Sequence, residues 1–211
     1  GKKDNLRQTI ADTCAEIVID LTRADSAYIN ARTIIESGAH PIIGTSGLVD
    51  EQIKELTMLA QEKQLGGIIV PNFSISAVLM MRFASQAAQY LSHAEIIEMH
   101  HLQKQDAPSG TAIKTADMIA KVWGDTPKQK NTFQELLPGA RGTQYQGISI
   151  HSLRLPGVLA QQQVIFGNTA ETLTITHDSI DRACFMPGVI LCCQKVKHLP
   201  TLYYGLEALL D

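Results

Sequence analysis

The chain has 211 residues, of which 45% are hydrophobic, 18% charged and 5% aromatic. This composition is typical of a folded globular protein and excludes a disordered or fibrous chain. No apolar run approaches the ~18 residues of a membrane span, and no signal peptide opens the sequence. The net charge is −3 and no basic stripe occurs, which argues against a nucleic-acid partner.

The four cysteines are Cys14, Cys184, Cys192 and Cys193, and none of them forms a CxxC motif. This usage is typical of buried thiols in a reducing compartment rather than of a disulfide framework. It predicts a cytoplasmic protein.

The first third of the chain alternates short apolar runs with segments of helical periodicity. Strands are predicted at residues 15–22, 40–43 and 67–70. Helices are predicted from Asp25 or Ser26 to Gly38, from Leu48 to Leu65 with Gly66 closing the helix, and over residues 74–90. This order indicates an α/β fold with a parallel sheet and right-handed crossovers.

Polar or glycine-bearing segments follow each of these strands, at residues 20–23, 44–47 and 71–74. Any one of them alone is an ordinary turn or helix cap. Ligands bind at the carboxyl ends of strands in a parallel sheet, so three such segments in succession favour a binding crevice.

The order of predicted elements changes after residue 90. A strand is predicted at residues 95–101, a helix at 111–123, and a loop at 124–147, where periodicity is weak. Further strands are predicted at 148–155, 162–166 and 171–176, followed by an apolar helix at 188–196. Consecutive strands indicate an antiparallel or mixed sheet in a second lobe.

Residues 100–112 carry the densest set of chemical groups. Ser109 or Thr111 can cap the following helix, and Gly110 lets a ligand approach the backbone. The helix N-terminus favours an anion, Lys104 adds a positive charge, and two adjacent histidines titrate near neutrality. This set suits a small carboxylated substrate that needs a proton.

Simpler interpretations exist for the same residues. Neighbours on a strand point to opposite faces, so one histidine can be a buried core residue, and Ser-Gly-Thr can be only a cap. A metal site formed by His100, His101 and Asp106 is another alternative. Lys104 would repel a cation, and no third His or Cys stands at usual ligand spacing, so we expect no metal.

The run over residues 95–112 resembles the hallmark segment of the 4-hydroxy-tetrahydrodipicolinate reductase (dihydrodipicolinate reductase) family, with its pattern E-x-H-H-x-x-K-x-D-x-P-S-G-T-A. Shorter matches extend over nearly the whole chain. Residues 20–22 resemble the family's Asp-Phe-Thr, residues 44–47 its Gly-Thr-Thr-Gly, residues 70–75 its Ala-Pro-Asn-Phe-Ser run, and residues 151–154 its His-Ser-x-Arg strand.

The resemblance implies that NADPH or NADH reduces the ring of a small cyclic dicarboxylate in lysine (diaminopimelate) biosynthesis. The family's proton donors correspond to His100 and Lys104, which are the implied catalytic residues. The residues implied for substrate binding are His101, Ser109, Gly110 and Thr111. The residues implied for the cofactor are Thr22, Arg23, Gly44, Thr45, Ser46, Val70, Pro71, Asn72 and Phe73.

The resemblance also implies a domain organisation and an assembly. Residues 1–73 and about 186–211 would form a Rossmann-like dinucleotide-binding domain. Residues 74–185 would form an α+β domain with a mixed sheet, which binds substrate and joins a homotetramer. The family opens with a strand and G-x-x-G-R-M-G, which holds the pyrophosphate, and this sequence has no such motif. We therefore expect the first βαβ unit to be missing and the chain as given to be inactive by itself.

Two alternative functions stay open at this point. A truncated, non-catalytic homologue would keep the dicarboxylate site for binding or serve in assembly. Another amino-acid-pathway dehydrogenase would share only the nucleotide-binding half, and the long match over residues 100–112 argues against it.

Overall fold

The computed structural model describes residues 5–124 and 134–210. The chain divides into two compact units. One comprises the chain up to Ile75 together with the segment from Phe185 onward, and the other comprises Ser76–Cys184.

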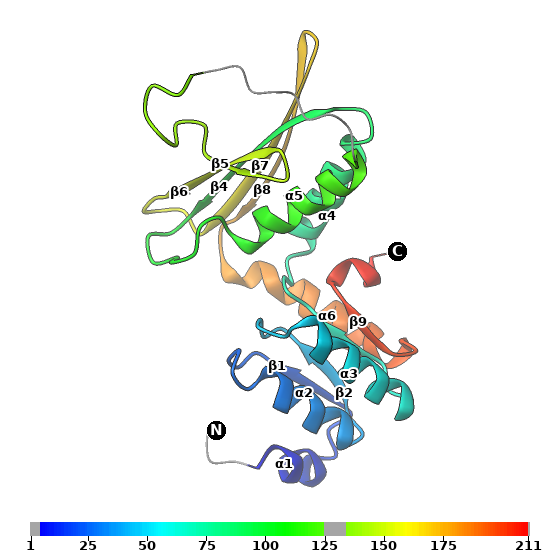
Figure 1. Ribbon diagram of the computed structural model, residues 1–211. Helices are drawn as coiled ribbons and strands as arrows, with labels where there is room; N and C mark the ends of the chain where they lie inside the picture. The colour runs from blue at the N-terminus through cyan, green and yellow to red at the C-terminus, as the bar shows by residue number, and fades with distance from the viewer. Residues whose placement is uncertain (1–4, 125–133, 211) are drawn as a thin grey trace. The chain divides into compact units, whose positions relative to one another are not determined.

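The first unit is built on a parallel sheet that has, in the described residues, the strand order β1-β2-β3-β9 (Figure 1). The strands are β1 (Ile17–Asp20), β2 (His40–Ile43), β3 (Gly67–Ile69) and β9 (Leu202–Tyr204). The helices are α1 (Leu6–Thr13), α2 (Ala27–Glu36), α3 (Asp50–Glu62) and α6 (Met186–Lys195). The predicted alternation of strand and helix is confirmed.

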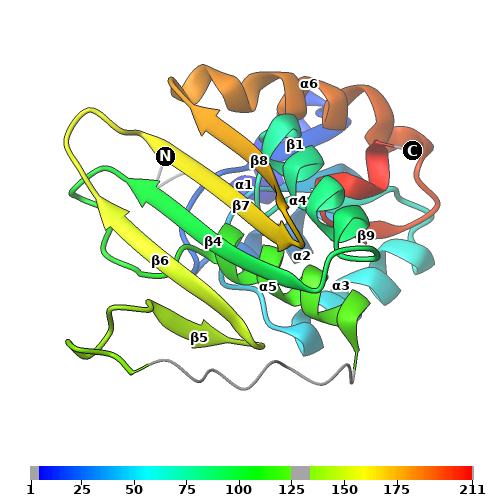
Figure 2. The same cartoon turned by 90° about the horizontal axis from the view of Figure 1, so that it is seen from above.

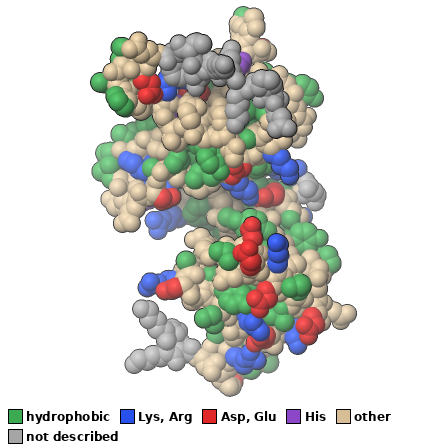
Figure 3. All heavy atoms as spheres, viewed as in Figure 1, with side chains coloured by type: hydrophobic (Ala, Val, Ile, Leu, Met, Phe, Trp, Pro, Cys, Tyr) green, Lys and Arg blue, Asp and Glu red, His purple; other side chains and the backbone are tan. Residues whose placement is uncertain are grey.

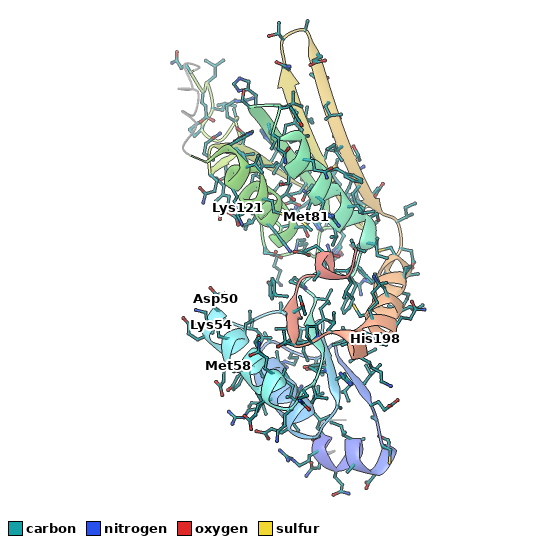
Figure 4. All side chains as sticks on the ribbon, turned by 90° about the vertical axis from the view of Figure 1, so that its right-hand side faces the viewer. Asp50, Lys54, Met58, Met81, Lys121 and His198 are labelled. Carbon is teal, nitrogen blue, oxygen red and sulfur yellow. The ribbon has the colours of Figure 1, made fainter. Side chains whose placement is uncertain are left out.

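Helix α3 shows how the sequence pattern fixes which side of a helix is buried. Leu56 and Ala60, four residues apart, are buried in the core. Asp50, Lys54 and Met58, at the same spacing, lie on its exposed face (Figure 4). Burial of the apolar stripe therefore orients the helix against the sheet.

Three features of this unit differ from the sequence-based expectation. Helix α1 and strand β9 were not predicted, and β9 pairs in parallel with β3. Gly66 does not close the preceding helix, because α3 ends at Glu62 and the left-handed residue there is Gln64, with φ 54°. A Cβ atom at Gly66 would lie 2.1 Å from the carbonyl oxygen of Val196. Close backbone approach explains this glycine.

The second unit is built on a mixed sheet, with the order β5-β6-β4-β7-β8 in the described residues. The strands are β4 (His93–His100), β5 (Thr143–Tyr145), β6 (Ile148–Arg154), β7 (Ala160–Asn168) and β8 (Glu171–Ser179). Strands β4 and β6 are parallel, and the other pairs are antiparallel. The predicted mixed sheet is confirmed.

Helices α4 (Ile75–Ala87) and α5 (Gly110–Trp123) lie on the same side of this sheet (Figure 2). Gln162 on β7 shows this directly, because its amide donates to Thr115 of α5 at 2.7 Å and to the sulfur of Met80 of α4 at 3.5 Å. Strand β4 consequently has a covered face, with Ile96 and Glu98 fully buried, and a more open face, with Glu95 and Ile97.

The prediction of a loop over residues 124–147 is wrong at one point. Strand β5 pairs with β6 through a tight turn at Gln146 and Gly147, both of which have positive φ. Such a two-residue turn joins antiparallel strands. Residues 125–133 of the predicted loop lie outside the described residues.

The four cysteines are free thiols. Cys192 is buried, and burial raises the pKa of its thiol to about 12. The expectation of buried thiols is wrong for Cys14, which is exposed at the end of α1.

Basic and acidic side chains are interspersed over the face drawn in Figure 3, in keeping with the small net charge. None of the helices in residues 5–124 and 134–210 combines the length and the apolar character that crossing a bilayer requires.

Candidate active site

The segment from the end of β4 to the start of α5 carries the predicted catalytic residues. His100 is the last residue of β4, and Gly110 is the first residue of α5. Ser109 caps the helix, since its hydroxyl accepts the N–H of Ala112 at 3.2 Å. The predicted cap is confirmed, and it places the amides of Gly110 and Thr111 in the first turn of the helix.

A buried carboxylate organises this end of the sheet. Glu98 is fully buried, and Arg154 binds both of its oxygens, from Nη1 to Oε2 at 3.0 Å and from Nη2 to Oε1 at 2.9 Å. Nδ1 of His100 lies 2.6 Å from Oε2 of the same carboxylate. Residues i and i+2 of a strand share a face, and β6 pairs Arg154 with His100. The sheet register therefore brings the three side chains together.

The same contacts set the protonation states of Glu98 and His100. Burial raises the pKa of Glu98, but hydrogen bonds from Arg154, Ser152 and His100 outweigh it, and the pKa lies below its ordinary value. Burial lowers the pKa of His100, and Glu98 opposes that effect only in part. At neutral pH, Glu98 is ionised and the imidazole is mainly neutral.

Lys104 and His101 have other partners in this structure. The ammonium of Lys104 lies 2.8 and 2.9 Å from the two carboxylate oxygens of Asp106, and this contact lowers the pKa of Asp106. His101 contacts Gln103 through Nδ1 at 3.0 Å. The charge of Lys104 also lowers the pKa of His100, so the two proposed proton donors influence one another.

The three side chains considered as metal ligands each contact a different group: His100 contacts Glu98, His101 contacts Gln103, and Asp106 contacts Lys104. Within the residues that the structure describes, no group of three or more His, Cys, Asp or Glu side chains is placed to hold a metal ion.

Gly110 lies next to open space. A Cβ atom built at this position would meet no atom within 4 Å, and its φ does not lie in the left-handed region. Packing of this chain therefore does not require glycine there. A glycine at the first turn of a helix leaves room for an anionic group to reach the backbone amides.

The predicted cofactor residues lie in the first unit, in the three turns that follow β1, β2 and β3. The N–H of Thr22 donates to the hydroxyl of Thr45 and to a carboxylate oxygen of Asp20, both at 2.9 Å. A Cβ atom at Gly44 would lie 2.5 Å from side-chain atoms of both Leu21 and Phe73. These contacts join the three turns into one edge.

This edge fits a nicotinamide dinucleotide. It lies at the carboxyl ends of a parallel sheet, where such cofactors bind. Two of its polar side chains are fixed by hydrogen bonds within the edge: the Thr45 hydroxyl donates to Asp20 at 3.3 Å, and Asn72 Oδ1 accepts the N–H of Ser74 at 2.9 Å. Arg23 and Ser46 are exposed, and Arg23 makes a 3.4 Å ion pair with Asp25.

Sequence reasoning did not assign a role to Glu98 or Arg154. Glu98 could have been singled out from the sequence, because it is a charged residue in an apolar strand, two positions before His100. Arg154 is 56 residues away from Glu98, and only the pairing of β4 with β6 connects them.

Comparisons with known proteins cover both units. The family model described as "Dihydrodipicolinate reductase, N-terminus" matches residues 2–73, and the model described as "Dihydrodipicolinate reductase, C-terminus" matches residues 76–210. A 4-hydroxy-tetrahydrodipicolinate reductase of Legionella pneumophila (strain Paris) is 62% identical over all of this chain and 86% of its own length. A reductase of the same name from Coxiella burnetii (strain RSA 493) is 53% identical with the same coverage.

A solved structure agrees with these sequence matches. The dipicolinate-bound dihydrodipicolinate reductase from Paenisporosarcina sp. TG-14 is 46% identical and superposes with a TM-score of 0.89, over 97% of this chain and 77% of that chain. An amine dehydrogenase from Mycobacterium smegmatis shares the fold, with a TM-score of 0.61 at 10% identity. The chain therefore belongs to the dihydrodipicolinate reductase family, whose members are NAD(P)H-dependent oxidoreductases of lysine biosynthesis.

Proposed function

We propose that this protein reduces 4-hydroxy-tetrahydrodipicolinate or dihydrodipicolinate to tetrahydrodipicolinate, with His100 as the proton donor and Lys104 as a second donor. The observation that carries this proposal is the His100–Glu98 contact of 2.6 Å at the end of β4. It leaves Nε2 of the imidazole as the nitrogen that serves a substrate. The names of the relatives, and the dipicolinate bound to the solved neighbour, support a small cyclic dicarboxylate as the substrate.

The groups around the loop suit two carboxylates on one ring. In this proposal, Ser109, Gly110 and Thr111 at the N-terminus of α5 bind one carboxylate, because the helix dipole and the first-turn amides favour an anion. His101 and Lys104 neutralise the other. Lys104 contacts Asp106 in this structure and exchanges that contact for the substrate.

The chemistry divides between the cofactor and the side chains. The 4-hydroxy compound first loses its hydroxyl group and a neighbouring proton as water, which gives the ring double bond of dihydrodipicolinate. NADH or NADPH, when bound, supplies a hydride with its two electrons to one carbon of that double bond. His100 gives the proton on Nε2 to the neighbouring carbon, and the double bond becomes a single bond. The imidazole returns to its neutral form with Nδ1 still on Glu98. A general acid of this kind contributes typically about 10²- to 10⁴-fold to the rate.

The two units take different roles in this proposal. Residues 1–73 and about 186–211 bind the dinucleotide through Thr22, Arg23, the turn at 44–46 and the turn at 70–73. Residues 74–185 bind the substrate and form the assembly contacts. The compact units, which change over near Ile75 and Phe185, support this division. The free thiols support a cytoplasmic location.

We also propose that the protein is a homotetramer joined through the sheet of the second unit. The face opposite α4 and α5 carries half-buried Ile97 and Ile165 beside a pocket of about 480 Å³. Along β8 this face continues with Thr174 and Thr176, which are uncharged. At these positions of β7 and β8 the face is apolar or uncharged, which suits burial against a second copy. The charged pair of Glu95 and Arg141 lies on the same face, outside the part proposed for this contact.

Oxidation of NADH or NADPH by the full-length protein, with enzymatically generated substrate, tests the proposed function. We expect substrate-dependent turnover that pyridine-2,6-dicarboxylate inhibits competitively. Binding of that dicarboxylate without any turnover would contradict the reductase and favour a non-catalytic binding protein.

A further inference from the structure

We propose that Glu98 is a positioning residue for the proton transfer: its buried carboxylate fixes His100 in the tautomer that carries hydrogen on Nδ1, and stabilises the imidazolium that donates from Nε2. This inference rests on the proposed function, in which His100 protonates the substrate. It adds a specific role for a side chain that the sequence motif left unassigned.

The geometry around the carboxylate supports this role. Oε1 accepts from Arg154 Nη2 at 2.9 Å and from the Ser109 backbone N–H at 3.3 Å. Oε2 accepts from Arg154 Nη1 at 3.0 Å and lies 2.6 Å from His100 Nδ1. An ionised carboxylate only accepts hydrogen bonds. His100 must therefore donate from Nδ1, so Nε2 is left to exchange a proton with the substrate.

The main chain of His100 is fixed as well as its ring. The backbone N–H of Leu155 donates to the carbonyl oxygen of His100 at 3.0 Å, and Arg154 Nη2 donates to the carbonyl oxygen of Asp106 at 2.6 Å. The end of β4 and the following loop are therefore held by Arg154, the last residue of β6, and by Leu155, which follows it. Such preorganisation is what accurate proton transfer requires.

The charge balance explains why a carboxylate is needed here. The charged groups that act on the His100 ring are Glu98 on β4, Arg154 on β6 and Lys104 in the loop, which is itself paired with Asp106. Arg154, Lys104 and burial all disfavour an imidazolium, and Glu98 favours it. The protonated form of His100 is already the minor form near neutral pH, and without the carboxylate it would be scarcer still.

A second histidine on the same sheet provides a matched control. His151 contacts Glu95 at 2.8 Å, but through Nε2, and Glu95 also binds Arg141. Glu95→Gln therefore makes the same chemical change on the same strand, next to a histidine and an arginine. It does so on the opposite face from the proposed proton donor.

The test compares Glu98→Gln with Glu95→Gln in the full-length protein, with NADH or NADPH and substrate. Glutamine keeps the size and one acceptor oxygen of Glu98 but carries no charge, and its amide favours the other tautomer of His100. We expect Glu98→Gln to lower kcat at least about 10-fold, toward the ~10⁴-fold loss seen when the carboxylate of a catalytic triad becomes an amide. We expect KM to change little.

The pH profile separates positioning from a general loss of structure. Loss of the carboxylate destabilises the imidazolium, so the limb of the kcat/KM profile that reports His100 moves to lower pH in Glu98→Gln. Glu95→Gln keeps the wild-type profile. The inference would be overturned if Glu98→Gln kept the wild-type kcat and the wild-type position of this limb of the kcat/KM profile, while His100→Gln was impaired.

A spectroscopic measurement requires neither turnover nor a change at Glu98. Long-range ¹H–¹⁵N NMR of the wild-type histidine rings, with His100 assigned by comparison with His100→Gln, reports its tautomer. Hydrogen on Nδ1 supports the inference, and a neutral ring with hydrogen on Nε2 contradicts it. A wild-type protein without reductase activity would instead contradict the proposed function, while the tautomer would still decide the contact with Glu98.

Discussion

The two glutamates of β4, Glu98 and Glu95, each form a Glu–His–Arg group of the same composition, on opposite faces of the sheet. On the covered face, Glu98 has no exposed side-chain surface and Arg154 only 19%. On the open face, Glu95 and Arg141, which pair around His151, keep 37% and 39% of theirs. Residue types are thus a poor guide to role, because burial and sheet register decide what each group does.

Water accounts for most of this difference. An exposed ion pair is screened and contributes about 0–1 kcal/mol to stability. A buried carboxylate that loses its partner keeps the desolvation cost and destabilises the fold by several kcal/mol. Loss of Arg154 or His100 as a partner is therefore expected to cost more stability at Glu98 than loss of a partner costs at Glu95.

The largest expected effect separates the two histidines. We expect His100→Gln to lower kcat by about 10²- to 10⁴-fold, because it removes the proposed general acid. His151→Gln, on the open face, is expected to stay within a few-fold of wild type. Steady-state kinetics with a folding check by circular dichroism measures both. Equal losses in the two variants would erase the functional distinction between the faces.

The next effect separates the two arginines by stability. We expect Arg154→Met to lower the free energy of unfolding by about 3–5 kcal/mol, because it leaves Glu98 buried without its bidentate partner. Arg141→Met is expected to cost less than about 1 kcal/mol. Urea unfolding of both variants gives the values. Similar midpoints for the two would mean that burial does not govern these pairs.

The smallest expected effect concerns the helix cap that Ser109 forms at the start of α5. Ser109→Ala removes the hydroxyl that caps the helix but keeps the backbone N–H that reaches Glu98. We expect a loss of about 1 kcal/mol in the free energy of unfolding. We expect the pH profile of kcat/KM to stay as in wild type. A moved profile would show that the cap, and not only the carboxylate, sets the state of His100.

The sequence predicts those parts of the fold whose signals are local. Strand His40–Ile43 is found at its predicted bounds, and helix Gly110–Trp123 begins within one residue of its expected start. Strand β9 has only three residues, too few for a periodic pattern, and its parallel pairing with β3 spans more than 130 residues. Strand β5 is equally short, although Gln146-Gly147 marked its turn.

The candidate site likewise has residues that a local motif identifies and residues that only strand pairing brings together. His100, Lys104 and the 109–111 turn lie within twelve residues, so a linear motif identifies them. The Glu98–Arg154 pair depends on β4 and β6 being adjacent, parallel and aligned so that His100 stands opposite Arg154. Neither composition nor periodicity predicts that register. A register shift of one residue between β4 and β6 would place the guanidinium of Arg154 on the other face of the sheet.

Residues 154 and 155 together act as a clamp on the loop between β4 and α5. Leu155 fixes the backbone at His100, and Arg154 fixes it at Asp106. The loop between His100 and Asp106, called the arch below, is thus held at both ends by residues 154 and 155. The side chains of the loop itself do not make these two contacts. We expect positions such as Leu102, Gln103 and Gln105 to accept substitution with the proton donor still in place, which makes the arch a place to redesign substrate preference.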